Sequence, residues 1–372
     1  MIKDYMAIFN LAENETDIRS LTTNRSIASV PIASRFRVVD FMLSNVVNAG
    51  ITNVGVFSKS NSRSLVDHIG DGKPWDLSRK NDGLFLFNHG IMEMINYDSK
   101  ILKNNMEYLY RSKSENVILT SSYMICNMDL SEAVKAHEAS GCDVTVVYTE
   151  SNNAHVDFQN CYTICVDEET NRVTGRGKNL GFDEKANVCM EIFLMKKSLL
   201  INLIYKNARV QSARSFYSAL FDEFNNGSIT MNAYKFGGYV SCINSISAYY
   251  RANMDMLKME VSTELFRSQR PVYTKIKDEP PTIYVKGCQV SNSLIADGCI
   301  IKGTVKNSVI GRFVEVEEGA VVENCIILQN IKIKANAKLH NVIVDKNVTI
   351  SENTELRGNE NFPLVIEKKN LL

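Results

Sequence analysis

Residues 310–356, IGRFVEVEEGAVVENCIILQNIKIKANAKLHNVIVDKNVTISENTEL, decide the fold of the C-terminal part of the chain. Aliphatic residues recur there at spacings of 6, 6, 6, 5, 6, 5, 6 and 6, namely at Ile310, Val316, Val322, Leu328, Ile333, Leu339, Val344, Ile350 and Leu356. A period near six is typical of a parallel β-helix, because each side of a coil points one aliphatic side chain inward. An antiparallel sheet would show a period of two and hairpin turns such as Asn-Gly, which this stretch lacks. We therefore predict a hexapeptide-repeat parallel β-helix over residues 283–372.

Upstream, over residues 1–258, apolar strand-like runs alternate with helix-like stretches. Examples are a strand at residues 53–57, a helix at Leu130–Ser140 that Gly141 ends, and a strand at residues 143–148. This alternation favours an α/β domain with a mostly parallel sheet covered by helices on both faces. Tyr162–Asp167 and residues 172–174 are predicted to form a hairpin inserted in that sheet. Residues 259–282 hold no sustained period, end in Asp-Glu-Pro-Pro, and are predicted to be a linker.

Length and composition limit the classes of protein that fit. At 372 residues the chain exceeds the roughly 250–300 at which one hydrophobic core stops growing, so two domains are expected. Lysine plus arginine and aspartate plus glutamate balance at 42 each, which favours neither a nucleic acid nor an anionic membrane as partner. We find no signal peptide and no apolar run long enough to span a membrane. Nine cysteines without a C-x-x-C pair fit a reduced, cytoplasmic protein.

The segment after the first strand-like run is unusual for a nucleotide-binding fold. A phosphate loop is expected at residues 9–21, FNLAENETDIRSL, and such loops need glycine so that backbone N–H groups can approach the anion. The chain has no glycine before Gly50, and this segment carries the acids Glu13, Glu15 and Asp17. The segment is therefore predicted not to bind a triphosphate.

Three other stretches carry a resemblance to a known family. They are LTTNRSIASVPIASRFRVVDFMLSNVVNAGITNVGVFSKS at residues 21–60, HIGDGKPWDLSR at 68–79, and NSLIADGCIIKGTVKNSVIGRFVEVEEGAVVENCII at 292–327. Together they resemble the ADP-glucose pyrophosphorylases (glucose-1-phosphate adenylyltransferases) of bacterial glycogen synthesis. The resemblance implies a Rossmann-like nucleotidyltransferase domain followed by a left-handed β-helix. It also implies the reaction of ATP with glucose 1-phosphate to give ADP-glucose and diphosphate.

The chain departs from the family pattern at the positions that carry the chemistry. The glycine-rich loop of the family is replaced by residues 13–19, and the lysine of its Lys-Pro motif is replaced by Ile27. The two carboxylates that hold Mg²⁺ in the family match Ser122 and Cys242, and neither is a hard anionic ligand for Mg²⁺. The resemblance thus implies no catalytic residue, no metal ligand and no cofactor in this chain, with Mg²⁺ expected only in a catalytic partner.

In this respect the chain resembles the non-catalytic, regulatory GlgD-type subunits of the family. The resemblance implies a heterotetramer in which such a subunit modulates a catalytic subunit and is itself inactive or nearly so. Two alternatives stay open: a slow but active sugar-phosphate nucleotidyltransferase with a rebuilt site, and a stand-alone binding or scaffold protein.

Candidate binding residues are cationic. Arg25 and Arg37 match arginines that bind phosphorylated effectors in regulated relatives, Arg35 lies between them in the sequence, and guanidinium groups suit phosphate. Lys338 and His340 on the predicted β-helix are expected to complete a site for a phosphorylated sugar or a nucleotide. Lys178 matches the family lysine that holds the sugar phosphate, although its neighbours differ. For each group the alternative is an ordinary surface or interface side chain.

Overall fold

The computed structural model describes residues 2, 4–58, 62–88, 102–209, 216–267 and 269–368. The chain divides into two compact units, each built from separate segments. Unit 1 comprises Met1–Glu13, Phe41–Ser241 and Arg270–Tyr273, and unit 2 comprises Asn14–Asp40, Cys242–Gln269 and Thr274–Leu372. The β-helix therefore forms one compact unit with two segments from the N-terminal part of the chain, so the units do not follow the predicted division at residues 258 and 283.

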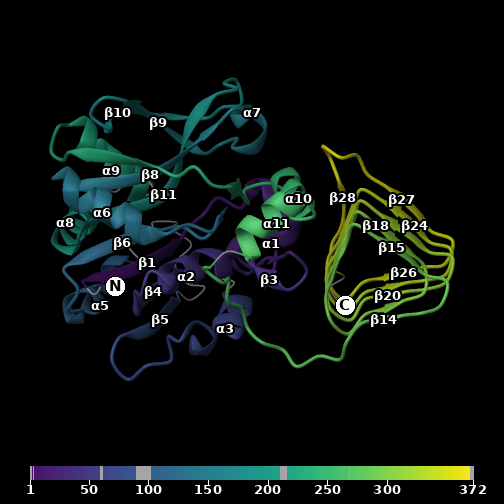
Figure 1. Cartoon of the computed structure of the whole chain (residues 1–372). Helices are drawn as coiled ribbons and strands as arrows, with labels where there is room; N and C mark the ends of the chain where they lie inside the picture. The colour runs from purple at the N-terminus through teal and green to yellow at the C-terminus, as the bar shows by residue number, and fades with distance from the viewer. Residues whose placement is uncertain are drawn as a thin grey trace. The chain divides into compact units, whose positions relative to one another are not determined.

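Unit 1 is built around a nine-stranded sheet with the strand order β5-β4-β1-β6-β11-β8-β12-β10-β9 (Figure 1). The strands are β1 (Tyr5–Leu11), β4 (Asn53–Ser58), β5 (Gly83–Asn88), β6 (Asn116–Thr120), β8 (Val144–Ser151), β9 (Tyr162–Asp167), β10 (Arg172–Lys178), β11 (Ala186–Lys196) and β12 (Met231–Lys235). β5, β4, β1 and β6 are parallel neighbours, as are β8 and β12. β9 and β10 form the predicted antiparallel hairpin.

Helices cover this sheet. They are α2 (Val38–Asn48), α3 (Arg63–Ile69), α5 (Met106–Arg111), α6 (Leu130–Ser140), α7 (Ala154–Asp157), α8 (Lys197–Arg209) and α9 (Phe216–Asn225). Apolar residues of α5, α8 and α9 share one core cluster with Met6 and Ile8 of β1. All seven residues of β1 are buried, as expected for a strand covered on both faces. α6 has the predicted bounds, with Asp129 as its N-cap and Gly141 in the left-handed conformation that ends it.

Strand β11 is the main element that the sequence does not predict. It lies between β6 and β8 and is antiparallel to both. The strands β5, β4, β1 and β6 on one side of it are parallel, whereas on the other side only β8 and β12 are parallel and β10 and β9 are antiparallel to their neighbours. Its apolar run continues into α8 with no glycine or proline between them, and periodicity alone does not separate such a strand from a buried helix.

The C-terminal part of unit 2 consists of three parallel sheets of five strands each, which form the sides of a triangular prism seen nearly end on in Figure 1. This arrangement confirms the predicted β-helix and is consistent with a left-handed one. The first sheet contains β14 (Ile283–Tyr284), β17 (Ile300–Ile301), β20 (Glu315–Val316), β23 (Lys332–Ile333) and β26 (Thr349–Ile350). The second contains β15 (Gln289–Ser291), β18 (Thr304–Lys306), β21 (Val321–Glu323), β24 (Lys338–His340) and β27 (Glu355–Arg357). The third contains β16 (Leu294–Ile295), β19 (Val309–Ile310), β22 (Ile326–Ile327), β25 (Val342–Val344) and β28 (Leu364–Ile366).

The aliphatic repeat forms the β-helix core, with one shift in register. Eight of the nine predicted aliphatic residues are buried, whereas Leu356 is half-buried. Ile327, rather than the predicted Leu328, stacks between Ile310 and Val344. This register makes the aliphatic spacings 6, 6 and 5 in successive coils of 17 residues.

The remaining elements of unit 2 come from the two other segments. They are α1 (Arg19–Thr22), β2 (Pro31–Ile32), β3 (Phe36–Arg37), α10 (Ile246–Asp255) and α11 (Met259–Phe266). α11 occupies the first part of the predicted linker. The sequence signal for it is weak because the helix has only eight residues and Leu265 is its one buried residue. Across the described ranges, no helix is both long and apolar enough to cross a membrane.

Candidate functional site

In unit 1, the segment that follows β1 places a carboxylate against Ser122. Glu13 Oε1 accepts a hydrogen bond of 2.8 Å from the backbone N–H of Ser122 and one of 2.7 Å from its hydroxyl group. Ser122 is completely buried, and it is the residue that the sequence resemblance matches to a family carboxylate that holds Mg²⁺. Its backbone and side-chain donors therefore already bond an anion that belongs to the chain.

In unit 2, the following residues of the same segment are held in a similar way. Glu15 Oε1 accepts a hydrogen bond of 3.1 Å from the backbone N–H of Ile27, the residue that the sequence resemblance matches to the family lysine. Asn14 Oδ1 accepts from the backbone N–H of Thr16 at 3.1 Å and from its hydroxyl at 2.7 Å. Carboxylate and amide side chains thus shape the segment. A triphosphate would meet the negative charge of these carboxylates, where a glycine-rich loop would offer it backbone N–H groups.

Two further residues that the sequence resemblance matches to family positions are Cys242 and Lys178. Cys242 is completely buried, and Lys178 lies exposed at the end of β10. The side chain of Asn179 donates to the carbonyls of Ala154 and Phe158 at 2.7 and 2.8 Å, so the residue beside Lys178 anchors the local backbone. Within the described ranges, no group of three or more histidine, cysteine, aspartate or glutamate side chains is arranged to hold a metal ion.

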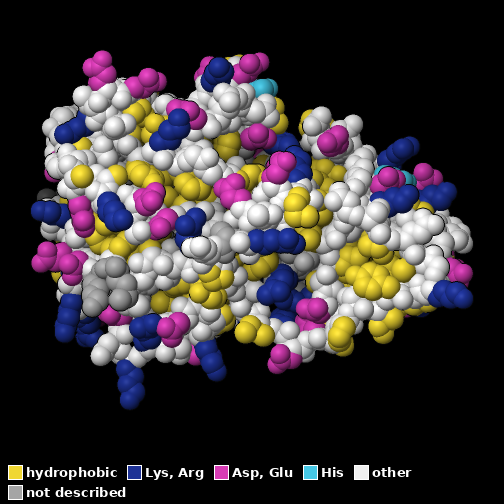
Figure 2. All heavy atoms as spheres, in the orientation of Figure 1, with side chains coloured by type: hydrophobic (Ala, Val, Ile, Leu, Met, Phe, Trp, Pro, Cys, Tyr) yellow, Lys and Arg dark blue, Asp and Glu magenta, His cyan; other side chains and the backbone are white. Residues whose placement is uncertain are grey.

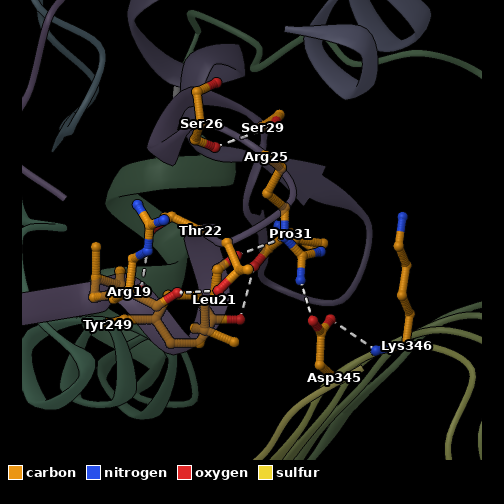
Figure 3. A network of polar contacts seen from close by, with 12 residues as sticks. Arg19, Leu21, Thr22, Arg25, Ser26, Ser29, Pro31, Tyr249, Asp345 and Lys346 are labelled. Atoms are coloured by element: carbon orange, nitrogen blue, oxygen red, sulfur yellow. Dashed lines mark hydrogen bonds and ion pairs between the residues drawn. The ribbon is translucent and has the colours of Figure 1, made fainter. Parts of the chain in front are cut away.

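The second candidate site lies within unit 2, around Arg25 (Figure 3). Arg25 is only 4% exposed, and its Nη2 forms an ion pair with Asp345 in the turn after β25. Its Nε donates to the carbonyl of Leu21 at 2.7 Å. Its Nη1 is also buried but makes no hydrogen bond within the part of the chain that the structure describes. A buried donor of this kind is uncommon, because leaving it unsatisfied costs free energy.

Further positive charge surrounds this arginine. Burial lowers the pKa of Lys346, and the positive charges of Arg25, Arg37 and Lys368 lower it further. Asp345 offsets part of this charge and accepts a hydrogen bond of 2.7 Å from the backbone N–H of Lys346. We call Arg25, Arg37, Asp345 and Lys346 the Arg25 cluster. Within it, Arg25 forms an ion pair with Asp345, and the charges of Arg25 and Arg37 act on Lys346.

Of the residues predicted to bind an effector, Arg25 and Arg37 belong to the Arg25 cluster, whereas Arg35, Lys338 and His340 do not. Arg37 belongs to the cluster and donates from Nη1 to the carbonyl of Ser29 at 2.7 Å. Arg35 is exposed and lies over the ring of Phe36, 5.2 Å from its centroid. Lys338 and His340 lie on β24, which belongs to a different sheet from β25.

His340 has a local partner instead, since its Nδ1 lies 3.2 Å from Glu323 Oε2. The residues that sequence reasoning missed are Asp345 and Lys346. The sequence contains a signal for Asp345. This residue lies 17 positions after Leu328 and thus puts a charge where the preceding coil buries an aliphatic residue.

Comparisons with known proteins agree with both parts of the fold. Residues 16–157 match the family model described as nucleotidyl transferase, and residues 282–361 match the model described as GlmU-like, C-terminal hexapeptide. The chain is 34% identical over 307 residues to the glycogen biosynthesis protein GlgD of Bacillus subtilis (strain 168), covering 81% of this chain and 78% of the relative. It is also 34% identical over 314 residues to GlgD of Geobacillus stearothermophilus, covering 82% and 79%. The glucose-1-phosphate adenylyltransferase of Mycoplasma mobile is 26% identical over 329 residues, covering 87% and 86%.

Proposed function

Because the chain belongs to the ADP-glucose pyrophosphorylase family, we propose that it is a catalytically silent, regulatory subunit of a glucose-1-phosphate adenylyltransferase in glycogen biosynthesis. The complex would convert ATP and glucose 1-phosphate into ADP-glucose and diphosphate in the cytoplasm. Mg²⁺ would be held by the catalytic subunit. The relatives named for glycogen biosynthesis and for the adenylyltransferase reaction support the pathway and the chemistry.

The contact between Glu13 and Ser122 is the observation that carries the proposed silence. Nucleotidyl transfer needs positive charge and oriented donors at the phosphates, and removing one such contact typically lowers the rate by about 10²–10³. This chain lacks the glycine loop, the lysine and both metal-binding carboxylates of the family pattern. Even if these losses are strongly non-additive, a combined reduction of roughly 10⁵ or more is expected.

We further propose that the first coil of the β-helix binds the catalytic subunit. β14, β15 and β16 are the outer strands of their three sheets, and the side chains of Ile283, Tyr284, Val285 and Val290 are 38–57% exposed. Figure 2 shows hydrophobic side chains gathered at the surface of the β-helix. Open strand edges beside apolar side chains favour association with another chain, and the matching coil of a second family member offers the same edges.

The Arg25 cluster is the proposed site for a phosphorylated sugar or nucleotide effector. The buried, unsatisfied Nη1 of Arg25 and the excess of positive charge around it support an anionic ligand. Such a ligand would compete with Asp345 for Arg25. Binding would therefore be linked to the position of the turn after β25, which supplies a route for regulation.

Co-expression with a catalytic subunit of the same family tests the proposal. The two chains are expected to co-elute in size-exclusion chromatography as a heterotetramer, and this chain is expected to change the KM or effector response of the catalytic subunit. A variant with Ile283→Lys and Val290→Lys should lose co-elution, whereas Phe182→Lys, also at an exposed hydrophobic residue, should retain it. Separate elution of the unaltered chains, with unchanged kinetics, would favour a stand-alone binding protein.

A further inference from the structure

A cavity in unit 1 lies outside the two candidate sites already described. It has a volume of about 390 Å³ and is formed by residues of β5, α5 and the segments beside them. A cavity of this size falls in the range that holds small-molecule ligands. The nucleotide and effector residues discussed above are absent from its lining.

The apolar part of the cavity wall consists of aromatic rings. Phe85 and Tyr108 lie with their ring centroids 5.1 Å apart, and Phe87 lies 5.2 Å from Tyr108 and stacks on Phe57 at 4.6 Å. These contacts hold the rings in place, yet Phe85 remains 41% exposed. A fixed ring with an exposed face in a concave site favours a ligand that has an apolar face of its own.

The polar part of the wall carries more negative than positive charge. Asp82, Glu107 and Arg111 line the cavity, and Arg111 Nη2 lies 2.5 Å from Glu107 Oε1. Deeper polar groups are bonded to one another, since the Tyr108 hydroxyl donates to Asn53 Oδ1 at 2.7 Å and Asn53 Nδ2 donates to Ser112 Oγ at 3.0 Å. Two carboxylates against one guanidinium group disfavour phosphate-bearing ligands.

We propose that this cavity binds a neutral saccharide. The C–H groups on one face of a pyranose ring would lie on Phe85, and its hydroxyl groups would donate to the carboxylates of Asp82 and Glu107. A pyranose has an apolar face that can stack on the aromatic rings and neutral hydroxyl groups that can donate to the carboxylates of the cavity wall. The choice of an α-1,4-glucan as the first saccharide to test rests on the proposed function. A bound glucan would let the subunit respond to the polymer that the pathway builds.

Titration of the full chain with maltotetraose tests this inference, followed by calorimetry or by saturation-transfer NMR. Phe85→Ala removes the ring and should weaken binding about five- to tenfold, as expected for the loss of one aromatic contact. Asp82→Asn should weaken binding while preserving the backbone, because asparagine tolerates the left-handed φ of 62° found there. Phe182→Ala removes a ring that is 84% exposed at a distant loop and should leave binding unchanged.

The outcomes separate this inference from the proposed function. Maltotetraose binding that Phe85→Ala weakens and Phe182→Ala does not would support it. Undetectable binding of maltotetraose and of cellobiose at tens of millimolar, binding equal in all variants, or displacement by ATP or glucose 1-phosphate would overturn it. Selective binding of cellobiose would support a neutral saccharide as the ligand but would contradict the choice of an α-1,4-glucan. Because the assay uses this chain alone, failure of binding leaves assembly with a catalytic subunit untouched, and failure of assembly leaves the saccharide result standing.

Discussion

The segment at Glu13 and the Arg25 cluster both occupy positions where the family pattern predicts contact with phosphate groups, but they differ in charge and in hydrogen bonding. At the first, a carboxylate already accepts two hydrogen bonds from Ser122. At the second, Arg25 pairs with Asp345, the positive charges of Arg25 and Arg37 act on Lys346, and a buried nitrogen of Arg25 lacks a hydrogen bond within the described ranges. At the first region a carboxylate of the chain thus already occupies the donors of Ser122, whereas the charge around Arg25 favours an added anion.

This difference is consistent with a subunit that has lost catalysis and kept regulation. Loss of one charged residue by drift would leave the other polar groups of a phosphate site unsatisfied, which costs stability. Here Glu13 and Glu15 accept hydrogen bonds from Ser122 and Ile27, so these two carboxylates are bonded within the chain. The predictions below perturb one region or the other, from the largest expected effect to the smallest.

Asp345→Ala should give the largest loss of stability. It leaves Arg25 buried without its ion-pair partner, and breaking a buried pair in this way typically costs about 3–5 kcal/mol. Chemical denaturation followed by circular dichroism measures the loss. The double variant Arg25→Met with Asp345→Leu should recover most of it, because both buried charges are then gone. A cost below about 1 kcal/mol for Asp345→Ala would mean that the pair does not stabilise unit 2.

Glu13→Gln should have an intermediate effect. It replaces a charged acceptor by a neutral amide oxygen that can still accept from both donors of Ser122, so the free energy of unfolding should fall by about 1–3 kcal/mol. Glu15→Gln is the matched control, because a single bond of 3.1 Å to Ile27 is weakened there and the cost should be about 1 kcal/mol or less. Neither variant should gain turnover. A gain with Glu13→Gln would show that this carboxylate was blocking an otherwise working site.

Lys346→Met should change the free energy of unfolding least. Whether it raises or lowers this free energy tests the cause assigned to the pKa shift of Lys346. The pKa of Lys346 is lowered from 10.5, so the folded state binds this proton less tightly than the unfolded chain does. The charge therefore opposes folding at neutral pH, and the penalty falls as the pH rises through the folded pKa toward 10.5. The variant should be as stable as the parent or more stable near pH 7, with the difference shrinking in alkaline solution. Denaturation at several pH values measures it, and a less stable variant at pH 7 would contradict the assigned cause.

Much of the fold could be predicted because burial is periodic in it. The β-helix repeat and the helix at Leu130–Ser140 follow directly from spacing, capping and glycine position. β11 could not be separated from α8 by sequence because no turn residue lies between them. The sequence does not show that Ile327, rather than Leu328, stacks in the core, because both residues are aliphatic and both are buried. The choice between them depends on the geometry of the coil.

The candidate site was less accessible to sequence reasoning. The absence of glycine from the segment after β1 could be read directly from the sequence, whereas the replaced metal-binding carboxylates are an expectation from the family resemblance. The hydrogen bonds from Ser122 to Glu13 could not be predicted, because the two residues lie 109 positions apart in the sequence. The ion pair between Arg25 and Asp345 could not be predicted either, because the two residues lie 320 positions apart in the sequence.

Turnover of the purified chain tests the proposed silence most directly. The chain, rigorously freed of any catalytic subunit, is mixed with Mg²⁺, ATP and glucose 1-phosphate, and the formation of ADP-glucose is compared with that of a catalytic homologue. We expect a rate lower by roughly 10⁵ or more. A rate comparable to that of the catalytic homologue would contradict the proposal that this chain is a silent, regulatory subunit.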